Sequence, residues 1–449
     1  MLDGSATIAS QRVPRYTSYP TAPHFHAGIE ATTYRRWIAE IAADSALSLY
    51  LHIPFCDTLC WFCGCHTKIV RRYDPVARYV EMLGQEIDLV AESLNGSHRV
   101  THIHWGGGSP TILASADMKS LVDRLHSRFR VSADAEFAIE IDPRGLTPEK
   151  VSVLAEIGTT RASLGVQDLD AIVQAAVNRH QPLAVTASAV DALRSAGVAS
   201  INIDLMYGLP HQTVAGVVNT VDAVLGLAPE RLALFGYAHV PWLKRHQRLI
   251  DERSLPGPEA RLCQFEAATT RLQEAGYVAI GLDHFAREND SLTNAQREGR
   301  LHRNFQGYTT DNASVLIGFG ASAIGATPKG YVQNATPMRD YGAALSEGRL
   351  PTARGLALND EDRLRRAVIE RLMCDLAVDL GAMRAQFARP AGHFRLELEK
   401  IGALRDQGIV EVQDENISVP SRARPWLRTV CAVFDQYLDR GETRHARAV

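Results

Sequence analysis

Four cysteines within ten residues constrain this chain more than any other feature of its sequence. They lie in the segment Cys56-Asp-Thr-Leu-Cys60-Trp-Phe-Cys63-Gly-Cys65, directly after the apolar segment 47–53, which we expect to form a strand. The other three of the seven cysteines are far apart along the chain. Thiolates crowded on one loop at a C-x3-C-x2-C spacing can converge on a single inorganic centre, so this motif predicts a metal site.

Three kinds of site compete for this loop. A disulfide framework is typical of small secreted chains, whereas this chain has 449 residues and residues 1–8 lack the basic and apolar blocks of a secretory signal. A structural zinc ion usually takes its ligands from two separated turns. An iron–sulfur cluster accepts closely spaced cysteines, because each thiolate binds a different iron. The motif favours the cluster and leaves zinc as the alternative.

Composition and charge narrow the class of protein. Hydrophobic residues make up 46% of the chain and charged residues 22%, which is typical of a globular protein with a sizeable core. The formal net charge of −3 argues against general nucleic-acid binding, which needs a basic face. No apolar run approaches the ~18 residues of a membrane span. We therefore expect a cytoplasmic enzyme that binds no nucleic acid and has no membrane span.

The first 30 residues predict an extended arm. Three prolines between residues 14 and 23 disfavour a helix there. The same stretch carries Tyr16, Tyr19 and Phe25, whereas disordered tails are usually poor in aromatic residues. We therefore expect the arm to pack on the rest of the protein.

Strands and helices alternate from residue 46 to residue 239, which predicts parallel βαβ units. In strand 47–53, Tyr50 and His52 share one face and the apolar residues share the other. Further strands are expected at 100–105, 135–142, 162–167, 200–207 and 232–239, and helices at 32–41, 75–94, 118–129, 147–157, 182–196 and 214–227. An open doubly wound sheet and a barrel both fit this order.

Polar residues at the carboxyl ends of these strands favour a barrel. Any one of them would serve as a cap or a loop anchor, but the pattern recurs at Glu140, Asp142, Gln167, Asn202, Asp204, Tyr237 and His239. Functional groups gathered on that rim are typical of (β/α) barrels. The fold we predict is a partial (β/α)6 TIM-like barrel with an N-terminal extended arm and a small, mostly helical C-terminal domain.

The glycine run 106–108 allows two interpretations. It can form a tight strand-to-helix turn, or it can let a ligand approach bare backbone. The run lacks the G-x-G-x-x-G spacing of a dinucleotide fold, which argues against NAD.

The sequence beyond residue 240 is less regular. A helix at 258–275 is followed by a final strand at 277–284, and the polar and aromatic segment 301–308 has no period and is expected to be a functional loop. Helices at 360–376 and 393–407 precede a hairpin at 409–419. The predicted division is an arm with a short helix at 1–40, a barrel at 41–350 and a helical C-terminal domain with a hairpin at 351–449.

Taken together, these segments resemble the oxygen-independent coproporphyrinogen III oxidases (coproporphyrinogen dehydrogenases), a branch of the radical S-adenosylmethionine (SAM) family. The resemblance covers almost the whole chain. It rests on Arg15-Tyr-Thr-Ser-Tyr-Pro20, His52-Ile-Pro-Phe-Cys56 with its cysteine loop, Gly106-Gly-Gly-Ser-Pro-Thr111, Glu140-Ile-Asp-Pro-Arg144, Gly165-Val-Gln167, Val177-Asn-Arg179, Asp204-Leu-Met-Tyr-Gly-Leu-Pro210 and His302-Arg-Asn-Phe-Gln-Gly-Tyr308.

The resemblance implies a set of site residues. Cys56, Cys60 and Cys63 would bind a 4Fe-4S cluster, and two SAM molecules would lie beside it. The first SAM would contact Tyr50, Gly107, Glu140 and Ile324. The second would contact Phe62, Gly108, Ser109, Gln167, Arg179, Asp204 and Ala238, with Ser109 standing where threonine is common. His52, Cys65 and Gln306 match catalytic positions, and the sequence does not fix the roles of His52 and Cys65.

The resemblance also implies the chemistry and the partners. A 5′-deoxyadenosyl radical made at the cluster would take hydrogen from two propionates of coproporphyrinogen III, and loss of CO2 would leave the vinyl groups of protoporphyrinogen IX. Arg15 and Arg303 are candidates for binding the substrate carboxylates. A low-potential one-electron donor such as a flavodoxin or ferredoxin would be needed, and the enzyme would be a monomer.

Two related groups are the alternatives that the family leaves open. Haem-binding chaperones of the radical SAM family resemble this chain, but they lack the fourth cysteine and the Arg15-to-Tyr19 arm that are present here. Haem-degrading radical methyltransferases share much of the barrel. A methylated product would identify the latter.

Overall fold

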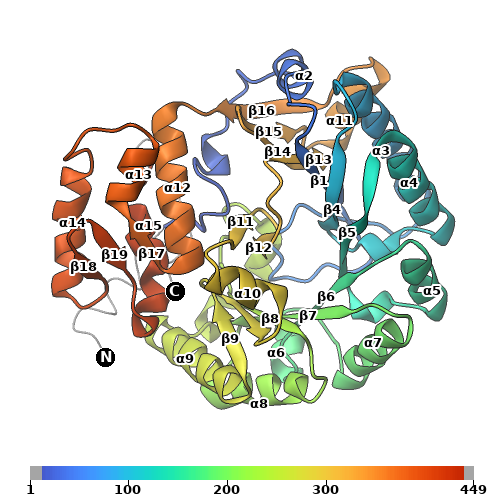
Figure 1. Ribbon diagram of the computed structural model, residues 1–449. Coiled ribbons are helices and arrows are strands. Elements are labelled where there is room, and N and C mark those ends of the chain that lie inside the picture. The colour runs from blue at the N-terminus through green and yellow to red at the C-terminus, as the bar shows by residue number, and fades with distance from the viewer. Residues whose placement is uncertain (1–12, 439–449) are drawn as a thin grey trace.

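A curved sheet of twelve strands organises the computed structural model, which describes residues 13–438 (Figure 1). At its centre lie neighbouring parallel strands, in the order β13 (Val315–Phe319), β1 (Ala46–Ile53), β4 (Arg99–Gly107), β5 (Arg130–Ile141), β6 (Arg161–Gln167), β7 (Ser200–Tyr207) and β8 (Arg231–Gly236). The last six in this order are the six strands expected from the sequence, so the predicted partial barrel is confirmed.

Antiparallel strands extend both edges of the parallel sheet. On one side these strands are β14 (Ile324–Thr327), β15 (Gly330–Asn334) and β16 (Thr352–Ala357), and on the other they are β10 (His284–Arg287) and β9 (Tyr277–Ile280). The expected single strand at 277–284 is therefore wrong. The chain reverses at Gly281, whose φ of 51° is left-handed, and β9 pairs with β10 as a hairpin.

Helices cover the outer face of the sheet in the βα order (Figure 1). The helix α3 shows why the sequence folds this way, because Val76, Val80, Leu83 and Ile87 form its buried stripe. The helices on this face are α2 (Ala31–Ala39), α3 (Asp74–Ser93), α4 (Ser115–Arg128), α5 (Pro148–Glu156), α6 (Ala171–Ala176), α7 (Leu183–Ser195), α8 (Val214–Leu225), α9 (Pro258–Glu274) and α11 (Met338–Ser346). The short helix α10 (Ser291–Arg297) lies on the inner side, where its Leu292 lines a cavity inside the barrel. No helix in residues 13–438 is long and apolar enough to cross a membrane.

Strand β1 separates the core from the interior of the barrel. Leu49, Leu51 and Ile53 are buried at 1%, 0% and 0% exposure. Tyr50 and His52 point the other way and are hydrogen-bonded to each other. The alternation predicted for this strand is confirmed.

The N-terminal arm packs on the protein, as its aromatic residues predicted. Tyr16 is buried and donates its hydroxyl to Asp435, while Tyr19 is buried and accepts from the backbone of Gln436. Phe25 stacks on Tyr331 of β15. The arm therefore touches both the sheet and the C-terminal segment. Residues 1–12 of the predicted arm lie outside the described residues.

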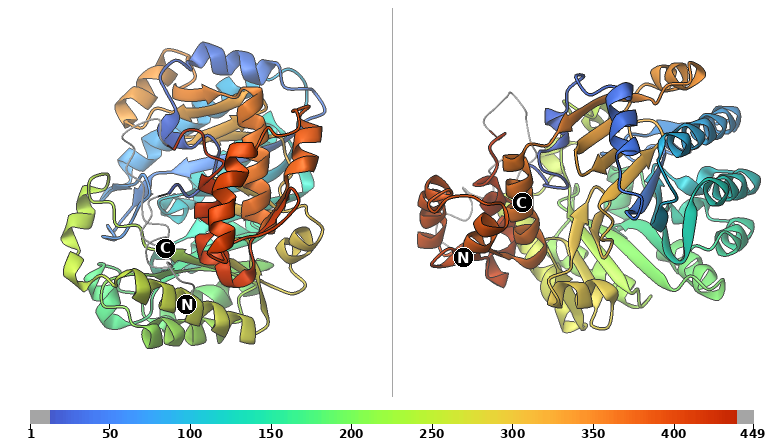
Figure 2. Two further views of the ribbon diagram at one scale, coloured as in Figure 1. Left: turned by 90° about the vertical axis from the view of Figure 1, so that its left-hand side faces the viewer. Right: turned by 45° about the horizontal axis from the view of Figure 1, so that its top comes forward.

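The C-terminal helices lie together at one end of the molecule (Figure 2). They are α12 (Asp360–Asp375), α13 (Leu380–Gln386), α14 (Arg395–Asp406) and α15 (Leu427–Ala432), and β17 (Ala377–Asp379) adds a third strand to the predicted hairpin of β18 (Glu411–Gln413) and β19 (Asn416–Ser418). The main sheet continues to Ala357, just past the predicted division at 350–351, and that division stays a prediction. Residues 439–449 of the predicted domain lie outside the described residues.

The segment expected to be a loop at 301–308 is a small hairpin, so that prediction is wrong. Strands β11 (His302–Asn304) and β12 (Gly307–Thr309) pair antiparallel. Their stability comes from tertiary contacts that leave no period in the sequence. The Arg303 guanidinium lies 4.4 Å from the centre of the Tyr308 ring, and His302 pairs with Glu370 of α12.

Candidate active site

The cysteine loop and the rim of the barrel enclose one cavity of about 280 Å³. Because the carboxyl ends of the parallel strands meet at the same edge, residues that are far apart in sequence line it together. The predicted residues in its wall are Cys56, Cys60, Phe62, Cys63, Cys65, Gly107, Gly108, Glu140, Gln167, Arg179 and Asp204.

The loop is held in place from two sides through its backbone carbonyls. Asn178 donates its side-chain amide to Leu59, and Val70 donates its backbone N–H to Cys56. On the other side, the side chains of Lys244, His246 and Gln247 contact the carbonyls of Cys65, Cys63 and Phe62 at 2.8, 2.8 and 3.0 Å. The thiols are thus presented by a braced loop, and none of these bonds uses a thiol.

Two guanidinium groups stand beside the Cys60 sulfur. The nearest nitrogens of Arg144 and Arg179 lie 3.5 and 3.4 Å from Sγ of Cys60. Both arginines also contact Asp142, at 2.5 and 3.4 Å. Burial opposes the charge of Asp142, but the hydrogen bond from Arg144 and the charge of Arg179 hold its pKa below the ordinary value. Cations at this distance stabilise a thiolate.

The donor set fits an iron–sulfur cluster. Burial, together with Cys63 and Cys60, raises the pKa of Cys56 to about 12, so this thiol keeps its proton until a metal replaces it. Among residues 13–438, no three cysteine, histidine or acidic side chains are grouped closely enough to hold a single metal ion together. A 4Fe-4S cluster makes no such demand, because each thiolate binds a different iron.

Glu140 is an ionised carboxylate at the centre of the rim. Its oxygens accept from the backbone N–H of Gly107 at 3.0 Å and lie 3.4 Å from Nε2 of His104. Burial opposes its charge, but these two contacts hold its pKa below the ordinary value. Glu140 therefore offers a fixed negative charge to a hydroxyl or ammonium group in the cavity.

The glycine run is needed for close packing as well as for its turn. Gly107 has a φ of 111°, and a Cβ there would lie 2.5 Å from the ring of His52. A Cβ at Gly108 would lie 2.5 Å from the carbonyl oxygen of Phe55. A side chain at Gly107 or Gly108 would therefore collide with the segment that leads into the cysteine loop, and one at Gly106 would collide with the carboxylate of Glu140.

The half-buried Tyr50 and the buried His52 form a hydrogen-bonded pair on β1, just before the loop. The Tyr50 hydroxyl lies 3.0 Å from Nδ1 of His52, and Nε2 of His52 lies 3.0 Å from the carbonyl oxygen of His66. Burial lowers the pKa of His52 to about 4, so the ring is neutral at pH 7. A neutral ring that donates from Nε2 accepts from Tyr50 at Nδ1. Ile324 lies nearby in β14, next to the strand position that pairs with Tyr50.

Six predicted residues are not in the wall of this cavity: Tyr50, His52 and Ile324, just described, and Ser109, Ala238 and Gln306. Ser109 is 3.2 Å from the Thr111 hydroxyl, just beyond the glycine run. Ala238 lines an adjoining cavity, and its carbonyl accepts from Gln247. Gln306 lies in the turn of the β11–β12 hairpin and lines a third cavity inside the barrel.

Comparisons with known proteins agree with this geometry. Residues 50–224 match the model of the radical SAM superfamily. Over 447 residues the chain is 49% identical to an oxygen-independent coproporphyrinogen III oxidase of Bradyrhizobium diazoefficiens, and the match covers 100% of this chain and 99% of the relative. A protein of the same name from Paracoccus denitrificans is 42% identical over 98% of this chain and 97% of its own. The chain belongs to this family of radical SAM enzymes.

A solved structure extends the agreement to three dimensions. The coproporphyrinogen III oxidase of Escherichia coli, a radical SAM enzyme, is 38% identical and superimposes with a TM-score of 0.91 over 95% of this chain and 100% of its own. Membership in the family implies a 4Fe-4S cluster and SAM as cofactors. The partial barrel is thus the radical SAM fold of this oxidase family.

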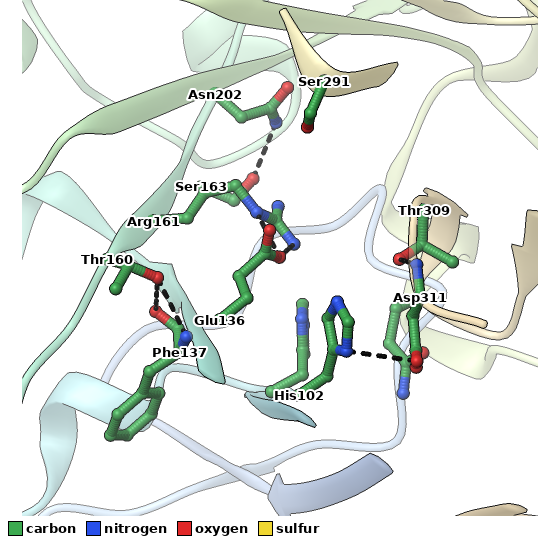
Figure 3. A network of polar contacts seen from close by, with 12 residues as sticks. His102, Glu136, Phe137, Thr160, Arg161, Ser163, Asn202, Ser291, Thr309 and Asp311 are labelled. Atoms are coloured by element: carbon green, nitrogen blue, oxygen red, sulfur yellow. Dashed lines mark hydrogen bonds and ion pairs between the residues drawn. The ribbon is translucent and has the colours of Figure 1, made fainter. Parts of the chain in front are cut away.

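Inside the barrel of the present chain, polar side chains form a network of hydrogen bonds and ion pairs next to the cavity that the cysteine loop encloses (Figure 3). The carboxylate of Glu136 accepts from Arg161 at 2.9 Å, and His102 lies 3.1 Å from Asp311. Asn202 connects the network to the rim by donating to Ser163 and Asp204 at 2.8 and 2.7 Å. The network holds the side chains inside the barrel in fixed positions, and through Asn202 it also orients Asp204 at the rim.

Some residues of the site could not be found from the sequence. Arg144 lies in the same short segment as Glu140, but only the fold brings it to the Cys60 sulfur, 84 residues away in the chain. Lys244, His246 and Gln247 lie in an irregular segment with no motif. Of these residues, only His104 could have been proposed as a site residue from the sequence, because it lies two positions before Gly106 and so shares a face of β4 with it.

Proposed function

We propose that this chain catalyses the SAM-dependent, oxygen-independent oxidative decarboxylation of two propionates of coproporphyrinogen III, giving protoporphyrinogen IX in haem biosynthesis. The observation that carries the proposal is the braced cysteine loop, which faces a rim of carboxylates and arginines in a chain that is 49% identical to an oxidase of this name over its whole length.

Cys56, Cys60 and Cys63 hold the 4Fe-4S cluster in this proposal. When bound, the cluster and SAM would supply the radical chemistry that removes a hydrogen atom from a propionate, with CO2 released and one electron passed to an external acceptor as the vinyl group forms. Arg144 and Arg179 stabilise the thiolate of Cys60. The neutral ring of His52 packs behind Gly107 and keeps the adjacent backbone in place.

Two SAM molecules occupy the cavity in this proposal. The first is held by Tyr50, Gly107, Glu140 and Ile324, where the carboxylate suits a ribose hydroxyl or an ammonium group. The second is held by Phe62, Gly108, Ser109, Gln167, Arg179, Asp204 and Ala238. Gln167 has a φ of 71°, which is uncommon outside glycine, at a register shift of β6. Such strain is typical of positions that aim a side chain at a ligand.

The roles proposed for Cys65 and Gln306 follow from the cavities that these residues line. The Cys65 thiol lines the cavity without serving as a fourth cluster ligand. Gln306, on the hairpin, lines the cavity inside the barrel and contacts the substrate in this proposal. The enzyme is a cytoplasmic monomer that receives electrons from a low-potential carrier such as a flavodoxin or ferredoxin. The division into an arm (1–40), a barrel (41–350) and a C-terminal domain (351–449) belongs to this proposal, in which the described part of the arm and the 301–308 hairpin keep water from the radical.

An anaerobic assay tests the proposal. Reconstituted protein is supplied with SAM, a chemical reductant and coproporphyrinogen III, and protoporphyrin (after oxidation) is measured together with 5′-deoxyadenosine. Two vinyl groups formed with matching deoxyadenosine are expected, and Cys60→Ala protein should contain no cluster and make neither product. SAM cleavage that leaves coproporphyrinogen intact would refute the proposal and favour a haem-directed radical SAM enzyme.

A further inference from the structure

Two largely exposed segments flank the cysteine loop on its outer side. We name them together the loop face; it consists of residues 68–72, which follow the loop, and residues 242–249, which come after the end of β8. The second segment contacts the loop, because Nζ of Lys244 lies 2.8 Å from the carbonyl oxygen of Cys65. No residue of the loop face lines the cavity that the cysteine loop encloses. The loop face is therefore a separate surface on the same loop.

The two segments meet beside His66, the residue that follows the fourth cysteine. Burial, followed by the charges of Lys244 and Lys68, lowers the pKa of His66. Charges act on a titrating ring in this way only when they are close to it. One lysine from each segment thus lies near the same ring.

Positive charge dominates the loop face, although the whole chain has a formal net charge of −3. The two segments contain six lysine and arginine residues and no carboxylate. Apart from Lys244, none of these six side chains forms an ion pair or a hydrogen bond with a described residue. The carboxylates next to the two segments along the chain are Asp74, Asp251 and Glu252, and the last two pair with Arg253 and His239. The loop face therefore offers cations to an anionic partner.

Apolar side chains lie exposed among these cations. Leu243 and Leu249 are 67% and 57% exposed, and Ile69 and Trp242 are 41% and 38% exposed. Four of the nine large hydrophobic side chains that are exposed among the described residues thus belong to these two short segments. Exposed apolar side chains gathered in this way, with tryptophan and arginine among them, are typical of a surface that binds another protein.

We propose that the loop face is the docking surface for an acidic one-electron carrier protein. This inference rests on the proposed function, because a 4Fe-4S cluster on this loop must be reduced from outside. Nε2 of His246 lies 2.8 Å from the carbonyl oxygen of Cys63, so a carrier docked here stands beside a proposed cluster ligand. One electron leaves the carrier, which is oxidised, and enters the cluster, which is reduced; no proton or group is transferred.

Charge and position both favour this partner. An acidic surface complements the unpaired cations, and such complementarity speeds association and selects the partner. Because the loop face lies outside the cavity wall, the carrier can dock while SAM and the substrate occupy the cavity.

Binding of an oxidised bacterial flavodoxin with an acidic surface tests the proposal without turnover. The full-length reconstituted protein is titrated with the flavodoxin by anaerobic calorimetry at low and at high ionic strength. The variants are the charge reversal Arg245→Glu/Arg248→Glu, the conservative Arg245→Lys/Arg248→Lys, and Leu243→Ser. The control is Arg339→Glu on α11, because Arg339 is 89% exposed and pairs with the adjacent Asp340.

The charge reversal should weaken binding of flavodoxin by about tenfold or more and should flatten its dependence on ionic strength. Leu243→Ser should weaken binding by about threefold or more, because an apolar contact is lost. The lysine variant and the control should bind as the unmodified protein does. The iron and sulfide content should be the same in all of them, which separates docking from a structural effect on the loop.

A reduction assay gives the matching kinetic readout. 5′-Deoxyadenosine is measured with flavodoxin, its reductase and NADPH, and separately with a chemical reductant. The charge reversal should raise the KM for flavodoxin by about tenfold and leave the rate with the chemical reductant unchanged.

Three results would overturn the proposal. Equal affinity of the charge reversal and the unmodified protein for flavodoxin would show that the carrier binds elsewhere. A raised KM for coproporphyrinogen III with the chemical reductant would place the loop face on the path of the substrate. Self-association that the charge reversal abolishes, without binding of flavodoxin, would assign the loop face to a second copy of the chain.

Failure of the proposed function has a different signature. In that case flavodoxin would bind at the loop face and support cleavage of SAM, yet no vinyl product would form. Vinyl product with the chemical reductant, together with flavodoxin binding that ignores the charge reversal, would leave the function standing and the docking surface refuted.

Discussion

At the scale of single residues, the site depends on charged side chains that are held in place by their contacts with other residues. Arg179 illustrates this, because it is 6% exposed and its guanidinium touches the Cys60 sulfur, Asp142 and the carbonyl of Gly165. One of these partners is a neutral carbonyl, and the other two are shared with Arg144. Arg179 therefore has charge to offer a ligand, such as the carboxylate of SAM, beyond what the cysteine loop requires.

Arg179→Ala should weaken the use of SAM while leaving the cluster in place. We expect the KM for SAM to rise by about tenfold or more, because one charge-assisted contact is lost, and the iron and sulfide content to stay unchanged. Arg194→Ala is the matched control, since Arg194 also binds backbone carbonyls, but on α7 and away from the cavity. Loss of iron from Arg179→Ala would show a structural role instead.

Asp204 should make SAM binding depend on pH. Burial and the nearby Glu140 carboxylate raise the pKa of Asp204 to about 6. The carboxyl is ionised above that pH and neutral below it, and the cationic SAM favours the ionised form. The dissociation constant for SAM should therefore increase as the pH falls from 7 to 5, by up to about tenfold per pH unit for one proton. Equilibrium binding measured across this range checks the expectation.

The Asp204→Asn variant is the control for that measurement. An amide does not titrate, so the variant should bind SAM weakly and with a flat pH profile over the same range. A variant that retains the slope of the unmodified protein would assign the titration to another group.

At the scale of elements, the short helical segment 245–249 acts as a brace for the cysteine loop. Its central residue, Gln247, is 0% exposed and bonds to the carbonyls of Phe62 and Ala238 and to the backbone N–H of Val240. One side chain thus joins the cluster loop to the end of β8. The position of the loop depends on a segment that lies more than 180 residues later.

Gln247→Ala should loosen the loop without removing a cysteine. The change leaves two partly buried carbonyls without this donor, at a cost of up to about 1–3 kcal/mol each, so we expect slower cluster reconstitution and faster proteolysis within residues 56–70. Gln273→Ala on α9 is the control, because that side chain is exposed. Reconstitution at the unmodified rate would mean that the contacts of Lys244 and His246 hold the loop unaided.

The elements also show how far the sequence could predict the fold. The alternation of strands and helices from β1 to β8 follows from local periodicity and short connections, and it was predictable. Strand β13 was not, because it pairs with β1 across more than 250 residues and no local pattern encodes that partner. Within the site, Glu140 and Asp204 were predictable because they stand at strand ends. The contact of Arg144 with Cys60 was not predictable, because the two residues are 84 positions apart and only the folded barrel brings them together.

At the scale of the whole molecule, the N-terminal arm connects parts that the chain itself separates. Tyr16 donates to Asp435 in the C-terminal segment, and the neighbouring Arg15 donates to Gly236 at the end of β8. The Tyr16–Asp435 bond spans 419 residues and is buried. A change at Tyr16 should therefore alter both the global stability and the position of Arg15 at the end of β8.

Tyr16→Phe removes one buried hydroxyl and keeps the ring. The carboxylate of Asp435 then loses a donor, which should lower the free energy of unfolding by about 1–3 kcal/mol, measured by denaturant titration. The matched control is Tyr73→Phe, which removes a comparable bond to Asp117 at the surface and should change stability little. Because Arg15 adjoins Tyr16, the KM for coproporphyrinogen III should rise in Tyr16→Phe, while the iron content and the KM for SAM stay constant. A loss of stability with an unchanged KM for the substrate would show that the arm supports the fold without positioning Arg15.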